Sequence, residues 1–84
     1  MTGIRITREA NGESTVITIV GWLRAENVEV LHHEIEQVRG PLVLDLSELQ
    51  SADAAGIAAL RAMTLHGAEF RGASGYIALL LRDT

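Results

Sequence analysis

The sequence predicts an α/β fold: a small mixed four-stranded sheet, with an N-terminal hairpin followed by parallel strands, and helices packed on it. Two observations support this prediction. The dipeptide Asn11-Gly12 separates two runs of strand-forming residues, which is the strongest short-range signal of a hairpin. The run from Leu42 to Leu46 is apolar apart from Asp45 and lies between two segments of helical periodicity. This is typical of a parallel strand covered on both faces.

The first half of the chain forms the hairpin and one helix in this prediction. Ile4 and Ile6 alternate with polar residues in the first strand, and a β-branched run from Thr15 to Val20 forms the second. In the helix that follows, apolar residues are spaced by three, four and three positions, at Val28, Leu31, Ile35 and Val38. We expect Gly40 and Pro41 to end it, because Gly accepts a left-handed cap and Pro cannot continue a helix.

The second half begins with a helix expected from about Ala54 to His66, which Gly67 ends. Its core-facing residues are expected to be Ile57, Leu60 and either Thr64 or Leu65. A short strand then covers about 69–72, and Ser74 caps a last helix through Leu81. The run YIALLL within that helix also fits a strand by periodicity alone. Residues 1–84 are thus expected to form a single domain.

The composition excludes several functional classes. Without cysteine, the chain has no disulfide, thiolate metal site or cysteine nucleophile. All seven basic residues are Arg, which rules out a Walker A or Schiff-base lysine. A formal net charge of -4 and scattered arginines argue against nucleic-acid binding. No apolar run reaches the ~20 residues of a membrane span and the first residues carry no export signal, so we expect a cytoplasmic protein.

The stretch SADAAGIAALRAM carries the most distinctive pattern. Asp53 is suited to accept hydrogen bonds from the free N–H groups that start a helix, and the small residues Ala54, Ala55 and Gly56 leave its first turn open to another protein. With ITIVGWL before it and HGAEFRGAS after it, this stretch resembles a STAS domain, the fold of bacterial anti-sigma factor antagonists. The resemblance covers nearly the whole chain, and the family's Asp, two small residues and Gly fall on these four positions.

The resemblance implies a regulator that works by protein binding, with neither catalysis nor a cofactor. In the family, the residue before the Gly is a Ser or Thr that a histidine-kinase-type anti-sigma factor phosphorylates. That position is Ala55 here, and its methyl group has no oxygen to accept a phosphoryl group. We therefore expect an antagonist that is not switched at this position. The alternative is a STAS-type scaffold or docking subunit of a signalling complex or a lipid-transport ATPase, and homodimer formation stays open.

Three further residues, Ser51, Trp22 and Arg24, are expected to line the edge of the contact surface. Trp is enriched in interface hot spots, although a Trp that merely covers the end of the sheet is an equal alternative.

The other residues that could bind a metal ion or take part in a reaction do not indicate an enzymatic activity. His32 and His33 are adjacent, so they point to different sides of a helix and do not bind one metal ion together. Asp45 ends the third strand, where a receiver domain keeps its phosphoacceptor. That chemistry also needs an acidic pair and a lysine, which the chain lacks. We predict neither a metal site nor an enzyme.

Overall fold

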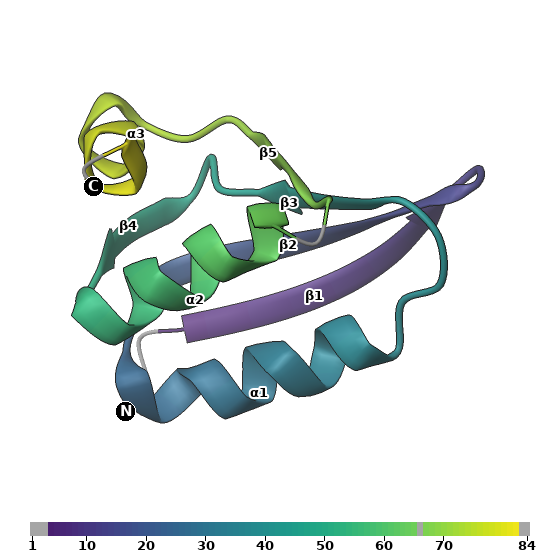
Figure 1. Ribbon diagram of the computed structural model, residues 1–84, viewed down its shortest axis with the longest axis horizontal. Helices are drawn as coiled ribbons and strands as arrows, with labels where there is room; N and C mark the ends of the chain where they lie inside the picture. Colours follow the sequence, from purple (N-terminus) through teal and green to yellow (C-terminus); the bar gives the residue numbers. More distant parts are fainter. Residues whose placement is uncertain (1–3, 66, 83–84) are drawn as a thin grey trace.

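The computed structural model describes residues 4–65 and 67–82. The elements run in the order β1 (Ile4–Asn11), β2 (Ser14–Leu23), α1 (Ala25–Glu36), β3 (Leu42–Asp45), β4 (Leu49–Ala52), α2 (Ala54–Leu65), β5 (Glu69–Arg71) and α3 (Gly75–Arg82) (Figure 1). The mixed α/β architecture with a leading hairpin agrees with the prediction. The sheet has five strands, however, and not the four expected. The added strand is β4, in the segment expected as a loop before the second helix.

Strand β2 is the centre of the sheet. It pairs antiparallel with β1 on one side and parallel with both β3 and β4 on the other, while β5 extends the sheet beyond β3. Strand β3 lies along Thr15–Thr18 and β4 along Gly21–Leu23, so the two short strands follow one another beside the same long one. The register shifts between Gly21 and Trp22, and this places Trp22 opposite Ser51.

The hairpin is confirmed, but its turn lies one residue later than the Asn-Gly signal suggests. Asn11 pairs with Ser14, so Gly12 and Glu13 are the two central residues of the turn. Gly12 has a φ of +67°, and the tight type II′ turn takes a glycine with positive φ at its first central position. The Ser14 hydroxyl donates to the Asn11 carbonyl at 3.0 Å and closes the loop.

One core lies between the sheet and the three helices. Figure 1 shows α2 in front of the sheet, with α1 below it and α3 at the upper left. The fully buried side chains come from every layer: Ile17, Ile19, Leu23, Leu31, Leu44, Leu46, Leu60 and Ile77. In β3, Leu44 points into this core, while Val43 and Asp45 on the opposite side are only partly buried. Among the described residues, no helix has the length and hydropathy of a membrane span.

Helix α2 uses a different set of core residues at its end than the sequence predicts. Ile57 and Leu60 are buried as expected. Neither Thr64 nor Leu65 faces the core, since Thr64 is exposed and Leu65 is 86% exposed. Met63 is buried instead, because it continues the spacing of three residues from Ile57 and Leu60.

The ends of the helices follow local rules. The N–H groups of Gly67 and Ala68 donate to the carbonyls of Thr64 and Met63, and Gly67 has a φ of +93°, as in a Schellman motif. His66, the expected last residue of this helix, lies outside the described residues. Ser74 caps α3 by accepting the Ile77 N–H at 3.2 Å, so the YIALLL run is helical.

Helix α1 ends earlier than predicted. Its last residue is Glu36, and the N–H of the following residue, Gln37, bonds back to the carbonyls of Glu34 and Ile35. The Val38 N–H then continues the turn by donating to Ile35 at 2.9 Å. Gly40, with a φ of +91°, redirects the chain into β3.

Candidate functional site

Asp53 lies between β4 and α2, and its carboxylate caps two helices. Oδ1 accepts the Gly56 N–H at 2.8 Å, in the first turn of α2, as the sequence predicts. Oδ2 accepts the Ala25 N–H at 2.9 Å, at the start of α1. The N-cap residue of α1 is Arg24, whose side chain has no oxygen to offer. Asp53 therefore supplies the missing acceptor from 28 positions further along the chain.

These hydrogen bonds lower the pKa of Asp53 below its ordinary value of 3.8. The largest cause is the backbone N–H of Gly56, followed by that of Ala25, since both favour the ionised carboxylate. The negative charge also lies at the N-termini of two helices, where their dipoles favour it. Asp53 is thus ionised at neutral pH and fixes the relative position of the two helix starts.

Two small side chains of α2 lie on the surface directly after Asp53. Ala54 and Ala55 are both exposed, in the first turn of the helix. Gly56 was expected beside them in the contact surface, but it is buried. A Cβ added there would lie 2.6 Å from the Leu23 carbonyl oxygen and 3.0 Å from Leu23 Cγ. Gly56 lets α2 pack closely on the end of β2, and so positions the surface without being part of it.

Trp22 and Arg24 border the same surface from the end of β2. Trp22 is 47% exposed, and the Arg24 guanidinium lies 4.9 Å from the centre of its ring, within the range of a cation–π interaction. The indole Nε1 donates to the side-chain oxygen of Gln50 at 3.3 Å. Gln50 is a residue that sequence reasoning missed. Only the pairing of β4 with β2 brings it to Trp22.

The structure thus brings six of the seven predicted site residues to one region. A shallow hollow of about 250 Å³ is lined by Trp22, Leu23, Arg24, Ser51, Ala52 and Asp53. Ala54 and Ala55 follow it directly in the chain. We call six residues of this region the helix-start surface, of which Ser51 is half-buried and the others are exposed: Trp22, Arg24, Ser51, Asp53, Ala54 and Ala55. A separate hollow of about 350 Å³ lies at the C-terminal ends of α1 and α2, is lined mainly by apolar side chains with His32, and contains none of these residues.

Asp45, the other candidate for chemistry, has a local structural role. Its Oδ1 accepts both the N–H of Ser47, at 3.0 Å, and the Ser47 hydroxyl, at 2.7 Å. These two bonds, the backbone one first, lower the pKa of Asp45 below 3.8. The pattern is that of a turn stabilised by an Asp side chain. Among residues 4–65 and 67–82, no three His, Asp or Glu side chains gather as metal ligands would.

Comparison with known proteins agrees with this geometry. A family model described as "Mlab, STAS domain" matches residues 6–81. Among solved structures, the chain is similar to the crystal structure of an antisigma-factor antagonist STAS domain from Rhodobacter sphaeroides. The identity is 22%, the match covers 86% of this chain and 92% of that chain, and the TM-score is 0.63. No curated protein sequence matches the chain. Because the family model spans the sheet and all three helices, the chain belongs to the STAS domain family.

Proposed function

We propose that this protein is a non-enzymatic regulator in the bacterial cytoplasm that docks on a protein partner through the helix-start surface. The observation that carries the proposal is the juxtaposition of exposed Ala54 and Ala55 with the half-exposed Trp22. The two alanines allow another backbone to approach closely, and Trp is the residue most enriched in interface hot spots. The double cap of Asp53 holds both parts in place before any partner arrives, which lowers the entropy cost of binding.

The partner we propose first is a histidine-kinase-type anti-sigma factor. Support comes from family membership and from similarity in fold to a STAS domain that is an antisigma-factor antagonist. In such a role Ala55 would keep the surface in its unmodified form, because a methyl group accepts no phosphoryl group. The protein would then act as an antagonist that its partner does not switch off at this position.

A specific observation favours a second candidate, a permanent docking subunit of a larger complex such as a lipid-transport ATPase. Such a subunit needs the contact surface but no phosphoryl acceptor. The first turn of α2 meets both conditions, since neither Ala54 nor Ala55 carries a hydroxyl group. The two candidates use the same surface and differ in the partner that it binds.

The test is a pull-down from the source cell with the wild type, Ala55→Asp and Ala10→Asp. Ala10 is exposed in β1, so Ala10→Asp is the matched control: it adds the same charge outside the helix-start surface. We expect the wild type and Ala10→Asp to recover one partner that Ala55→Asp loses. A kinase-type ATPase identifies an antagonist, and a transport ATPase identifies a docking subunit. Recovery of the same partner by Ala55→Asp, with its circular dichroism unchanged, would exclude the helix-start surface.

A further inference from the structure

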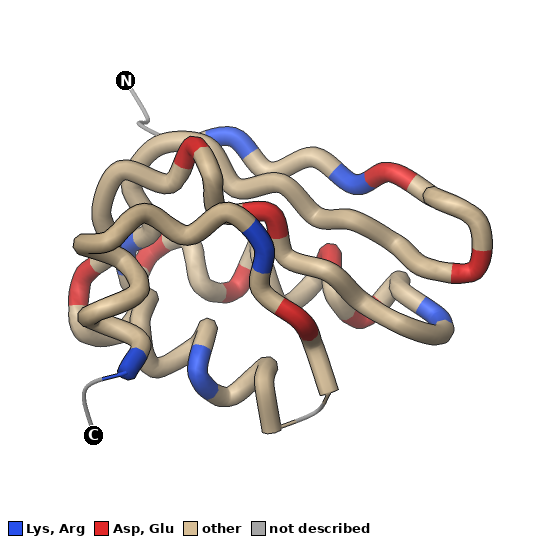
Figure 2. The backbone as a smooth tube through the Cα atoms, turned by 90° about the horizontal axis from the view of Figure 1, so that it is seen from above, with Lys and Arg blue, Asp and Glu red and all other residues tan. Residues whose placement is uncertain are grey.

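Strand β1 is a long free edge of the sheet. Within the described part of the chain it pairs with β2 on one side and with no strand on the other, and every residue in it except Ile4 and Ile6 is exposed. The opposite edge, β5, is only three residues long. Figure 2 shows the β1–β2 hairpin along one border of the molecule, with no helix or strand beyond it in that view. A long free edge is a template for pairing with a further strand.

The hairpin turn determines which backbone groups of β1 point outward. Asn11 and Ser14 flank the two-residue turn, so they exchange backbone hydrogen bonds with each other. Such bonded pairs alternate along an antiparallel ladder, and this ladder has no register shift. The N–H and C=O groups of every second residue therefore point away from β2: Ile4, Ile6, Arg8 and Ala10. Outside the β1–β2 ladder, no backbone–backbone hydrogen bond of the described residues involves β1.

One pairing of β1 with a second copy of this chain satisfies both these groups and the charges. Two-fold symmetry makes the strands antiparallel, and outward residues must face outward residues. An axis through Arg5, Arg8 or Glu9 would set that charge opposite its own copy, which is destabilising. An axis through Thr7 places Arg5 opposite Glu9 of the second copy and brings the two Thr7 side chains together. It pairs residues 4–10, which is almost the whole strand.

Arg5 and Glu9 have charges that a second copy can pair. Both are exposed, and they lie on the same face of β1. Four residues of strand separate them by about 13 Å, so they do not pair within one chain. The one ion pair of the described residues joins Arg8 to Glu34 instead. In the Thr7 register the contact between Arg5 and Glu9 forms twice, because the two-fold axis repeats it.

The ion pair of Arg8 removes an obstacle to this pairing. An inward-pointing charge on an edge strand ordinarily prevents a further strand from adding. Arg8 lies on the same face of β1 as Ile6, towards α1, and its guanidinium donates to the Glu34 carboxylate at 3.1 Å. In the Thr7 register Arg8 stands opposite Ile6 of the second copy and not opposite another charge. Its aliphatic stem packs there while its charge stays with Glu34.

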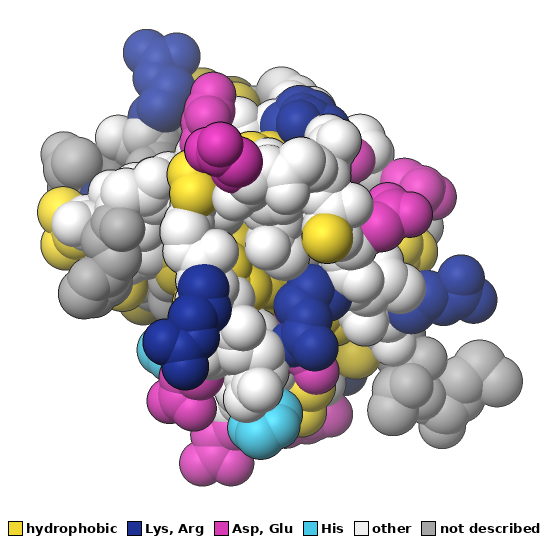
Figure 3. Space-filling view, turned by 90° about the vertical axis from the view of Figure 1, so that its right-hand side faces the viewer, with side chains coloured by type: hydrophobic (Ala, Val, Ile, Leu, Met, Phe, Trp, Pro, Cys, Tyr) yellow, Lys and Arg dark blue, Asp and Glu magenta, His cyan; other side chains and the backbone are white. Residues whose placement is uncertain are grey.

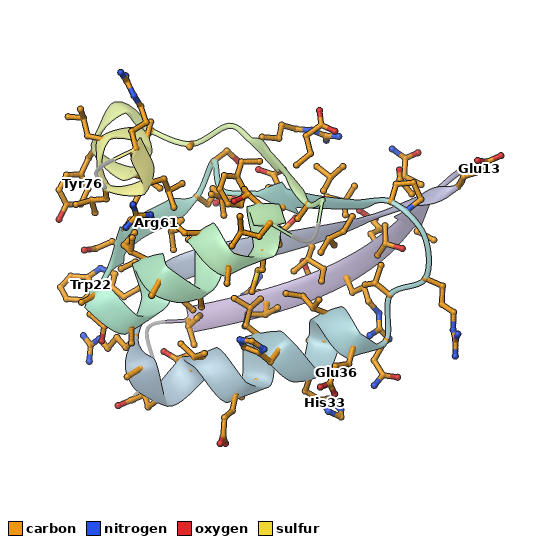
Figure 4. All side chains as sticks on the ribbon, viewed as in Figure 1. Glu13, Trp22, His33, Glu36, Arg61 and Tyr76 are labelled. Atoms are coloured by element: carbon orange, nitrogen blue, oxygen red, sulfur yellow. The ribbon has the colours of Figure 1, made fainter. Side chains whose placement is uncertain are left out.

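We infer that two copies of this chain associate through β1, antiparallel about a two-fold axis at Thr7, and form one continuous sheet. The inference goes beyond the proposed function and does not rest on it. Figure 4 places Glu13 at the tip of the hairpin and Trp22 at the opposite end of the molecule. Antiparallel pairing therefore sends the two helix-start surfaces to opposite ends of the joined sheet and leaves both free.

Two other occupants fit this edge less well. An extended segment of another protein can use the same outward backbone groups, but only a second copy matches Arg5 with Glu9 by symmetry. An anionic surface requires a cluster of basic residues. Basic, acidic and His side chains are instead interleaved at the end of the molecule that carries the hairpin turn (Figure 3).

The first test uses a single cysteine in the full chain, which has none of its own. Only a residue on the axis faces its own copy, and the Cα atoms of such a non-hydrogen-bonded pair lie about 4.5 Å apart, within the range of a disulfide. We expect Thr7→Cys to form a disulfide-linked dimer under mild oxidation. The matched controls are Arg5→Cys and Glu9→Cys on the same exposed face. They should form none, since about 13 Å separates each from its own copy.

The second test exchanges the charges and measures the dissociation constant of the dimer by analytical ultracentrifugation. Arg5→Glu sets like charges opposite each other at both contacts, so it should raise the dissociation constant by about tenfold or more. Glu9→Arg should do the same, and the two changes together should restore the wild-type value. Arg39→Glu, at an exposed site before Gly40, reverses a charge elsewhere and should have no effect. Circular dichroism checks that each variant folds.

The other outcomes separate this inference from the proposed function. A wild type that stays monomeric, with no disulfide in Thr7→Cys, would overturn the inference. So would a dimer that the double exchange fails to restore, or that all three cysteines crosslink equally, because the contact would then lie in another register or surface. Arg5→Glu and Ala10→Asp alter β1 alone, so both should still recover the partner in the pull-down. Loss of the dimer therefore leaves the helix-start surface standing, and recovery of the partner by Ala55→Asp leaves the dimer standing.

Discussion

Asp53 Oδ2 accepts the Ala25 N–H at 2.9 Å and so joins the start of α1 to the residue that starts α2. The backbone N–H of Asp53 also donates to the Leu23 carbonyl at 3.0 Å, at the end of β2. One residue therefore connects a strand end with two helix starts. These connections are made without a bound partner, so they hold the residues of the helix-start surface in place before a partner arrives.

The first prediction is that Asp53→Ala destabilises the fold more than Ser74→Ala does. Ser74 caps one helix, and its loss should cost about 0.5–1 kcal/mol. Asp53 caps two, so its removal leaves unpaired N–H groups on both α1 and α2. Asp53→Asn keeps one acceptor oxygen and should fall between Asp53→Ala and the wild type. Urea unfolding followed by circular dichroism measures the order, and equal midpoints for Asp53→Ala and Ser74→Ala would contradict the double cap.

The second prediction concerns pH. The folded-state pKa values of Asp53 and Asp45 lie below the ordinary 3.8, so the unfolded chain binds more protons as the pH falls. The stability contributed by these groups is present above about pH 4 and is lost as the pH falls through the folded-state pKa values. Thermal unfolding between about pH 6 and pH 2.5 should show this loss.

The matched variants for this titration are Asp53→Asn and Asp45→Asn. Each removes one titrating carboxylate, so each should flatten the fall in Tm relative to the wild type, starting from a lower Tm at neutral pH. If the Tm of a variant falls with pH as steeply as the Tm of the wild type, the carboxylate that the variant lacks contributes nothing to acid unfolding.

The third prediction is that Gly56→Ala destabilises the protein by about 1–3 kcal/mol, as overpacking does. The new Cβ would lie 2.6 Å from the Leu23 carbonyl oxygen, which is backbone and can yield only if α2 moves away from β2. Gly75→Ala is the control, because Gly75 is also helical and a Cβ there meets nothing within 4 Å. It should be neutral or stabilising by up to about 1 kcal/mol. Equal urea midpoints for the two variants would show that α2 moves away from β2 to accommodate the new Cβ without loss of stability.

Features with local signals were predictable from the sequence. The hairpin, the helix end at Gly67 and the cap at Ser74 each depend on residues within a few positions of one another. The cap of α2 by Asp53 belongs to the same class, since donor and acceptor are three residues apart. Such contacts can be predicted from a local sequence pattern, because they depend little on how the rest of the chain folds.

Non-local features were not predictable in this way. Strand β4 is four residues long with only Leu49 buried, and it forms because it pairs with Gly21–Leu23 of β2, which lie 28 or 29 positions earlier in the chain. The second bond of Asp53, to Ala25, depends on the same pairing. One signal could have suggested it: the helix that starts at Ala25 follows Arg24, which offers no capping oxygen. The burial of Gly56 depends on how α2 crosses the end of β2, which no local pattern encodes.

The last prediction is that Trp22→Ala weakens capture of the partner by about tenfold or more while leaving the fold nearly as stable, because the side chain is half-exposed and hot-spot Trp residues contribute this much. Val30→Ala is the control, since Val30 is similarly exposed but lies on α1. Trp22 is the only Trp, so its fluorescence reports on this site alone. Acrylamide should quench it readily in the free protein and much less in the complex. Quenching that the partner leaves unchanged would place the contact away from Trp22, even if the Ala55→Asp variant fails to bind.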